Sequence, residues 1–448
     1  MKKYILFLIA FMVYVTAQAQ TDTLTHFSLE QAIDYAIKKQ YDMEKAQLDV
    51  QATEMQFKEV RGVGMPQINA GVDFRQYFQI PTTVVKASAF DPTAPPDAVA
   101  ALKFGTTFNT TASVTASQIL FSSDYIVALQ ATKELRELTA KNLYRTEIEV
   151  AYGVTKAYYL VLVTTERIKL VDFTLERLEK LLSDTRASYQ AGFVEKIDVD
   201  RIEVNYNNAL VERQNLQTGI EIVLNMLKFQ MGYPIEQPLV LTAQLDKVIF
   251  EGLVVDTTSS VNNRIEYDLL QSKLRINEFD LKRRKLAYAP YFGAYAGFAM
   301  QAMRYQFDLF NFSKDWYPYS YWGLQLNVPV FDGLQKHYKI QQAKISMLQT
   351  KQDMYKLESG IKVEVRAAAI NYQGALNVLK TRKANMDLAA NVAVVTKEKY
   401  QAGVGTNIEV VTAVSEYRTS QINYFNALYD AITAKTEYEK AKGTLYTR

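Results

Sequence analysis

The sequence contains no cysteine and only two histidines, His26 and His337, among its 448 residues. Disulfides, thiolate zinc sites, cysteine nucleophiles and a histidine metal cluster within one chain are therefore excluded. Lys and Arg number 51 against 48 Asp and Glu, so the chain lacks the basic excess typical of a nucleic-acid binder. No phosphate-binding loop, pair of catalytic acids or Ser-His arrangement occurs in its required context. We therefore expect no cofactor and no enzyme activity.

Long apolar runs are also missing, apart from one at the N-terminus. Residues 1–19 predict a secretory signal peptide, in which Lys2 and Lys3 precede an apolar stretch over residues 4–15. Ala17 and Ala19 form a small-x-small cleavage site. The stretch is shorter than the roughly 20 residues that cross a bilayer as a helix. We therefore expect an exported protein that has no membrane-spanning helix and that can contact a membrane again only through strands.

Proline is scarce, and its 10 residues leave two long tracts free of it, one between Pro96 and Pro234 and one after Pro329. Because proline breaks helix interiors, both tracts predict helices. The phrase Tyr-Gln-Ala-Gly occurs once in each tract, at 189–192 and 400–403, and glycine after a helical run marks a helix end. Each tract is therefore predicted to hold two helices joined by a tight turn, with the first helices at about 122–190 and 332–401.

Apolar residues recur every seven positions in the first of these long helices. The series comprises Val154, Val161, Ile168, Leu175, Leu182 and Tyr189. This period favours a coiled-coil seam over the core stripe of a globular bundle, because helices of this length would extend beyond a compact domain.

The two phrases lie 211 residues apart, and flanking segments align at similar offsets. Each half is predicted to follow the order helix, strand, loop, strand, long helix, turn, helix. We accordingly divide the chain into the signal peptide (1–19), a first repeat (20–231), a joining segment (232–260) and a second repeat (261–448).

Four segments alternate between apolar and polar residues, at 67–75, 108–118, 291–300 and 322–328. This pattern predicts strands with one polar face, either in a soluble sandwich or in a membrane with the apolar face in lipid. The signal peptide favours the membrane. Aromatic residues near the strand ends predict an interfacial girdle: Tyr77, Phe78, Trp316, Tyr317, Tyr319 and Tyr321. Four strands cannot close a membrane barrel, so several chains would have to share one, and three chains give about twelve strands.

These segments together resemble the TolC-like outer membrane factor (outer membrane efflux protein) family over essentially the whole mature chain. The resemblance rests on FSLEQA at 27–32, SQILF at 117–121 with its partner VPVFDG at 328–333, and the two Tyr-x-x-Gly turns. It implies a mixed α and β membrane protein. Three chains would form a 12-stranded outer-membrane β-barrel, with four strands per chain, continued by a long periplasmic α-helical coiled-coil barrel with an internal two-fold repeat.

The resemblance implies the passive exit duct of a tripartite efflux pump or type I secretion system. The implied partners are two further copies of the chain, a periplasmic adaptor, an inner-membrane transporter and outer-membrane lipid, without nucleic acid. The loops at 79–105 and 301–319 would face the cell exterior, and segment 232–260 would join an equatorial collar. The alternative is a non-transporting periplasmic coiled-coil scaffold.

The resemblance also assigns candidate residues. The turns 192–198 and 403–409 would form the periplasmic entrance, where Glu409 matches a position that often carries an acid and Asp198 is its counterpart in the first repeat. Either acid could instead serve only the helix N-terminus, where negative charge is favoured. The turns and the adaptor contact would use Gly192, Val194, Gly403, Val404 and Gly405. The lumen-facing candidates are Asp73, Arg75, Gln325 and Asn327, although Asp73 and Arg75 could simply form a salt bridge.

Overall fold

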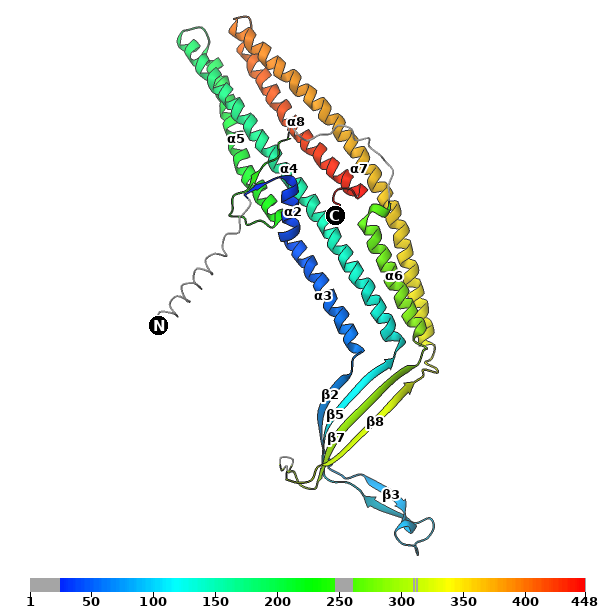
Figure 1. Cartoon of the computed structure of the whole chain (residues 1–448). Helices are drawn as coiled ribbons and strands as arrows, with labels where there is room; N and C mark the ends of the chain where they lie inside the picture. The colour runs from blue at the N-terminus through cyan, green and yellow to red at the C-terminus, as the bar shows by residue number, and fades with distance from the viewer. Residues whose placement is uncertain (1–24, 246–260, 309–310, 312, 448) are drawn as a thin grey trace, which may run out of the picture. The chain divides into compact units, whose positions relative to one another are not determined.

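The computed structural model describes residues 25–245, 261–308, 311 and 313–447. The predicted signal peptide and residues 246–260 of the predicted joining segment lie outside these ranges. The helices are α2 (Leu29–Lys39), α3 (Tyr41–Val63), α4 (Ser123–Gln190), α5 (Lys196–Met231), α6 (Ile265–Leu286), α7 (Gln335–Gln401) and α8 (Asn407–Lys442) (Figure 1). The strands are β1 (His26–Phe27), β2 (Gln67–Gln76), β3 (Thr82–Lys86), β4 (Val99–Lys103), β5 (Phe108–Phe121), β6 (Val240–Leu241), β7 (Tyr291–Arg304) and β8 (Tyr317–Asn327).

The element order repeats along the chain. Helix α3 is followed by β2, β5, α4 and α5, and α6 is followed by β7, β8, α7 and α8. The long helices α4 and α7 have 68 and 67 residues, and α5 and α8 have 36 each. This order and the helix ends at Gln190 and Gln401 agree with the prediction from the Tyr-Gln-Ala-Gly phrases. The chain forms two compact units: residues 1–50, 139–270 and 353–448 make the first, and residues 51–138 and 271–352 the second.

The first unit is built on the apolar seam of α4. Val154, Val161 and Leu182 are at most 6% exposed, whereas Tyr189, at the end of the predicted series, is 44% exposed. Neighbouring seam residues pack against Ala209 of α5 and Val414 of α8. The seven-residue period therefore predicted the buried stripe correctly except at Ile168, which is half-buried, and at Tyr189. Within the described residues, no helix has an apolar stretch long enough to cross a membrane.

A second cluster of the first unit surrounds Tyr158, which is fully buried. Its hydroxyl donates a hydrogen bond to the Phe27 carbonyl (3.0 Å) and accepts one from the Ala243 amide (3.3 Å). Phe27 belongs to β1, which pairs in parallel with β6. The tyrosine therefore ties α4 to the short sheet that β6 forms within the predicted joining segment.

Arg264 anchors the start of α6 in the same unit. Its buried guanidinium lies 2.9 Å from the Glu266 carboxylate and 3.2 Å from that of Glu364, and it donates a hydrogen bond to the Ala441 carbonyl at 2.8 Å. Burial alone would raise the pKa of Glu266, but the hydrogen bond and charge of Arg264 outweigh burial and lower it. The network joins α6, α7 and α8 through paired charges.

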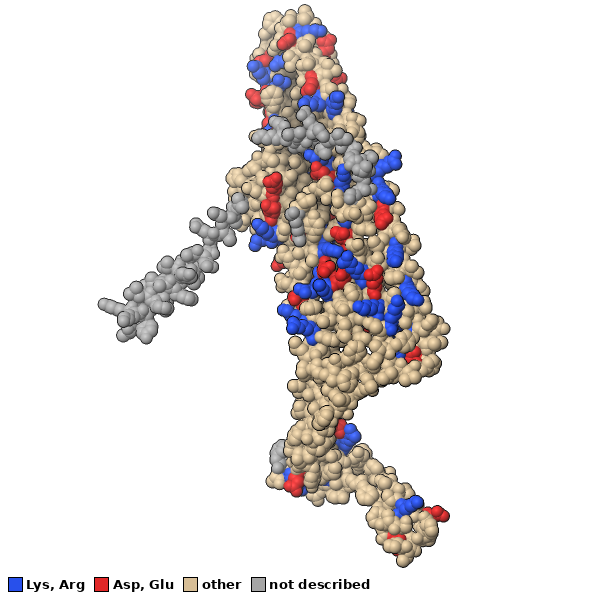
Figure 2. All heavy atoms as spheres, turned by 45° about the vertical axis from the view of Figure 1, so that its right-hand side comes forward, with Lys and Arg blue, Asp and Glu red and all other residues tan. Residues whose placement is uncertain are grey.

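The second unit contains an antiparallel sheet in the order β2-β5-β7-β8. The register places Val72, Ala112, Met300 and Pro318 in one row. The face that carries this row is mostly apolar and includes Ile68, Val114, Phe298, Trp322 and Leu324. The opposite face carries Asn69, Ser113 and Gln325. Only three charged residues occur in these four strands (Asp73, Arg75 and Arg304), and Figure 2 shows the corresponding band of surface almost without blue or red.

Three features of this unit differ from the prediction. Segment 79–105 was expected to be a loop but contains the antiparallel hairpin of β3 and β4. Strand β7 continues to Arg304 and β8 begins at Tyr317, so the second loop is shorter than 301–319. Tyr317, Tyr319 and Tyr321 pair with Gln301, Ala299 and Gly297 and so lie on the polar face. They therefore cannot belong to a girdle on the apolar face.

Candidate functional site

The first helical turn follows α4 and contains Gly192. This glycine has a φ of +77°, and the amides of Gly192 and Phe193 donate to the carbonyls of Tyr189 (3.0 Å) and Ser188 (2.9 Å). A left-handed residue closing the last turn in this way is the common glycine end of a helix. Phe193 is 84% exposed, whereas Val194 is half-buried. The turn therefore presents an apolar ring at its tip.

The second turn, after α7, has the same geometry. Gly403 has a φ of +73°, and the amides of Val404 and Gly405 donate to the Lys399 carbonyl at 3.0 and 3.1 Å. A Cβ on Gly405 would lie 3.0 Å from the Tyr400 amide nitrogen, so the backbone would crowd any larger side chain at this position. Val404 is 78% exposed. Gly192 and Gly403, the glycines of the repeated phrase, thus lie at the predicted helix ends, and the residue after each of them, Phe193 or Val404, is highly exposed.

Asp198 and Glu409 both lie at the third position of the helix that follows each turn. The Asp198 carboxylate accepts from the Glu195 amide (3.4 Å), and the Glu409 carboxylate accepts from the Thr406 amide (3.2 Å). Each acid therefore completes a capping box. Asp198 also lies 3.8 Å from Arg201. Within the described residues, Glu409 is exposed and has no ion pair, so it is the acid that retains an uncompensated charge.

The Asn407 side chain joins the two turns. Asn407, the first residue of α8, is 6% exposed, and its amide group donates a hydrogen bond of 3.0 Å to the Asp198 carbonyl. The starts of α5 and α8 therefore lie side by side. Sequence reasoning paired Asp198 with Glu409 but gave no role to Asn407.

The four predicted lumen-facing residues share one face of the sheet. Asp73 pairs with Thr111, which pairs with Gln301, and Gln325 and Asn327 pair with Gly293 and Tyr291 in the same alternation. The Asp73 and Arg75 side chains form an ion pair of 2.7 Å. The face therefore brings the four residues together, but the two charges compensate each other. Their pairing was the alternative that the sequence left open.

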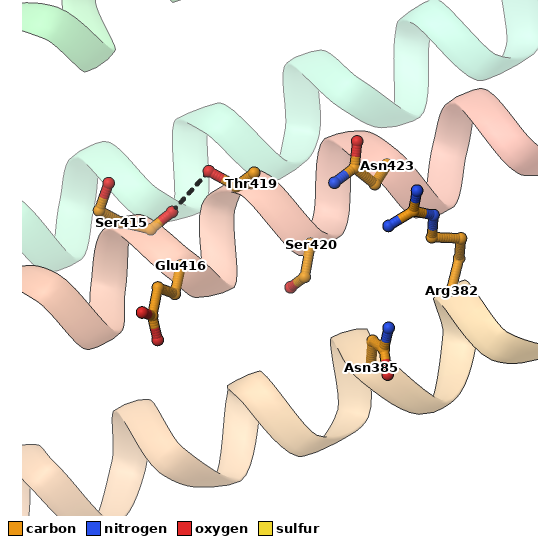
Figure 3. A pocket seen from close by; sticks show the side chains of 7 residues that line it. All are labelled: Arg382, Asn385, Ser415, Glu416, Thr419, Ser420 and Asn423. Carbon is orange, nitrogen blue, oxygen red and sulfur yellow. Dashed lines mark hydrogen bonds between the residues drawn. The ribbon is translucent and has the colours of Figure 1, made fainter.

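A polar groove between α7 and α8 was not predicted. It has a volume of about 270 Å³ and is shown in Figure 3. Its lining residues are Arg382, Asn385, Ser415, Glu416, Thr419, Ser420 and Asn423. Arg382 and Asn423 lie at one end and Glu416 at the other. The structure shows no ion pair for Arg382 or Glu416 within the described ranges. The signal in the sequence was a run of Ser, Thr and Asn where α8 would otherwise carry apolar residues.

Comparison with known proteins shows one consistent relationship. The family model for outer membrane efflux proteins matches residues 32–232 and 271–444. The outer membrane protein TolC of Vibrio cholerae is 19% identical over 343 residues, which cover 75% of this chain and 76% of that protein.

Solved structures resemble the fold at lower identity. The open state of the Neisseria gonorrhoeae MtrE outer membrane channel superposes with a TM-score of 0.72 at 14% identity, covering 93% of this chain and 88% of that one. CusC gives a TM-score of 0.71 at 14% identity, covering 92% and 91%. The outer membrane protein VceC of Vibrio cholerae gives 0.68 at 13% identity, covering 93% and 96%.

Proposed function

Because this chain belongs to the outer membrane efflux protein family, we propose that it is the passive exit duct of a tripartite efflux pump or type I secretion system. The chain is an outer membrane efflux channel of the TolC-like kind and extends from the outer membrane into the periplasm. The duct would carry substrates delivered by an inner-membrane transporter and a periplasmic adaptor to the cell exterior.

One observation carries this proposal: the sheet of the second unit has an apolar face, a polar face and two edges. Its order is β2-β5-β7-β8, so β2 and β8 have a neighbour on one side only among the described residues. Unpaired backbone groups are costly in hydrocarbon, since each loses hydrogen bonds worth several kcal/mol. We therefore propose that three copies join β2 to β8 in a 12-stranded barrel. Lipid would contact the apolar face, and Asp73, Arg75, Gln325 and Asn327 would line the lumen.

The two helical turns are proposed as the periplasmic entrance. Three copies would bring three Glu409 carboxylates near one axis, where close like charges attract cations. Asp198 is the weaker candidate because Arg201 lies beside it. The exposed side chains of Phe193 and Val404 support an adaptor contact at the turns, which would include Gly192, Val194, Gly403 and Gly405. The polar groove on α7 and α8 would extend that contact along the two helices, away from the turn.

The proposal is tested by two neighbouring substitutions in β8. Leu324 lies on the apolar face and is 57% exposed, and Gln325 lies on the polar face. Leu324→Arg should impair insertion into lipid, because an arginine facing hydrocarbon costs about 2–4 kcal/mol at mid-membrane. Gln325→Arg should be tolerated. Purified protein would be added to planar bilayers and its ion conductance recorded.

Native protein and Gln325→Arg are expected to give discrete channels, and Leu324→Arg few or none. A native protein that is soluble without detergent and never conducts would contradict the duct and favour the coiled-coil scaffold. Equal insertion of both variants would contradict the proposed orientation of the sheet.

A further inference from the structure

The polar face of β7 and β8 carries a cluster of tyrosines that the duct proposal does not use. We refer to it as the tyrosine patch, and its members are Tyr291, Tyr295, Tyr319 and Tyr321. Their odd positions place all four on the face of Gln325, away from Trp322 and Leu324. The patch lies within one two-stranded part of one sheet, so its geometry depends only on the register of that pair.

Two glycines leave room for two of the rings to lie against the sheet. Tyr295 pairs directly with Gly323, and Gly297 pairs directly with Tyr321. A Cβ on Gly323 would lie 2.6 Å from Cζ of Tyr295, and one on Gly297 would lie 2.5 Å from Cζ of Tyr321. Such distances are far below van der Waals contact, so the far end of each ring occupies the space of the missing side chain. Each ring therefore lies across the opposite strand instead of standing upright.

The remaining members continue the same arrangement. Tyr291 lies over Gly293 of its own strand, where a Cβ would meet its hydroxyl at 3.0 Å. Tyr319 pairs with Ala299, which is only 2% exposed. Every tyrosine of the patch thus has a glycine or alanine beneath or opposite it. Small residues at these positions let the rings lie close to the backbone of the sheet. The patch is therefore aromatic but does not extend far from the sheet.

The ring faces remain open on the side away from the sheet. Tyr295, Tyr319 and Tyr321 are 43%, 48% and 45% exposed. The centroids of Tyr295 and Tyr321 are 6.2 Å apart with planes at 60°, and those of Tyr319 and Tyr321 are 6.4 Å apart with planes at 21°. The Tyr319 and Tyr321 rings are nearly parallel and the Tyr295 ring is tilted beside them, so a further flat ring can stack on one ring and contact its neighbour.

The electrostatics of the patch favour a cationic occupant. The face of an aromatic ring is electronegative and attracts cations. Elsewhere the chain places its own cations over aromatic rings. The Arg177 guanidinium lies 4.5 Å from the centroid of the Phe173 ring, and the Lys440 ammonium lies 4.4 Å from that of Tyr152. In the described part of the chain, no Lys or Arg lies over a ring of the patch. The nearest paired charges of this face, on Asp73 and Arg75, neutralise each other.

We propose that the tyrosine patch is a binding surface for planar aromatic cations in transit. The proposal rests on the proposed duct, in which this face lines the lumen and three copies would present three patches. Stacking onto the rings supplies the contact, and the positive charge of the solute is attracted by the open ring faces. The low position of the rings leaves the passage wide, so binding is weak and reversible, as conduction requires.

The test uses the full-length protein in detergent and ethidium, a planar aromatic cation. Ethidium is titrated against the protein, binding is followed by fluorescence anisotropy, and micelles alone are subtracted. Tyr295→Thr with Tyr321→Thr should weaken binding by about fivefold or more, the smallest loss expected for two aromatic contacts. Tyr295→Phe with Tyr321→Phe should keep the native affinity, since the rings remain. Tyr305→Thr, an exposed tyrosine just beyond β7, should have no effect.

Two further arms keep the test independent of folding in the threonine variant. Gly323→Ala leaves all tyrosines in place but displaces the ring of Tyr295, and it should weaken ethidium binding by about threefold. Tetrapropylammonium, a cation without a flat ring, keeps the attraction of its charge to the rings but cannot stack on them, so it should bind at least about tenfold more weakly than ethidium.

Unchanged ethidium affinity in the threonine and alanine variants would overturn the proposal, as would no binding to native protein or equal binding of tetrapropylammonium. If the protein gives any of these results but still forms channels in planar bilayers, the binding surface is overturned and the duct proposal stands. Variant-dependent ethidium binding by a protein that never conducts would overturn transit and the duct together, while the binding surface would stand.

Discussion

Two glycines illustrate how single residues hold the repeated fold in the first unit. Gly232 ends α5 with a φ of +67°, and Gly443 ends α8 with a φ of +74°. A Cβ on Gly232 would lie 2.5 Å from the Lys39 carbonyl oxygen, and one on Gly443 would lie 2.3 Å from the Asn263 carbonyl oxygen. Both contacts are with backbone, which cannot rotate away. Each glycine therefore packs against the segment before the helix that leads to the sheet, once in each repeat.

Gly232→Ala and Gly443→Ala should each destabilise the protein by about 2–4 kcal/mol, combining left-handed strain with the backbone clash. Denaturant unfolding followed by circular dichroism measures this loss. Gly374→Ala is the matched control, because it lies inside α7 with nothing within 4 Å of the added Cβ. It should leave stability unchanged or raise it by up to about 1 kcal/mol. Equal effects at the three positions would show that the close backbone approaches carry no energy.

At the scale of elements, the sequence predicted helices better than sheet faces. Proline-free tracts and glycine ends located α4 and α7 within a few residues, because helix propensity and termination are local properties. The hairpin of β3 and β4 was missed because Val84 and Val85 are adjacent, so neither face shows a period of two. The orientation of Tyr319 and Tyr321 was misjudged because aromaticity was weighed above alternation. The groove near Arg382 requires knowing which faces of α7 and α8 meet.

The capping box of α8 allows the charge of Glu409 to be tested apart from its structural role. Glutamine also serves at the third position of a capping box, so Glu409→Gln should keep the helix start and change stability by less than about 0.5 kcal/mol. Removing the charge should weaken blockade of the channel by hexaamminecobalt(III) by about tenfold, equivalent to about 1.4 kcal/mol. Conductance at increasing cation concentration measures the effect.

Asp198→Asn is the control, and its effect on blockade should be smaller because Arg201 already compensates Asp198. Blockade that does not change in Glu409→Gln would leave Glu409 with the role of a helix cap only.

For the whole molecule, the proposal of further copies rests on the two edges that the sheet has among the described residues. The family match agrees with an efflux channel, and the fold resembles that of solved outer membrane channels. The proposed closure joins β2 of one chain to β8 of a neighbouring chain. The sequence leads to the same proposal by the number of strands, since four strands with a lipid-facing side cannot satisfy their own edges. The register between copies could not be predicted, because alternation fixes which face a residue occupies but not its neighbour across an edge.

The absence of cysteine makes this closure directly measurable. Asn69→Cys in β2 is combined in turn with cysteine at each polar-face position of β8, and the membranes are oxidised. At the correct register, disulfides should link chains into covalent species of two and three, because cysteines cross-link only when their Cα atoms lie within about 7 Å. For the proposed ring of three chains, no larger species should form, because a closed ring has no free edge.

The control is Thr111→Cys with Gln301→Cys, which pair within one sheet and should give monomers only. Species larger than three chains would indicate an open polymer, and no cross-link at any register would mean that the edges of the sheet do not meet.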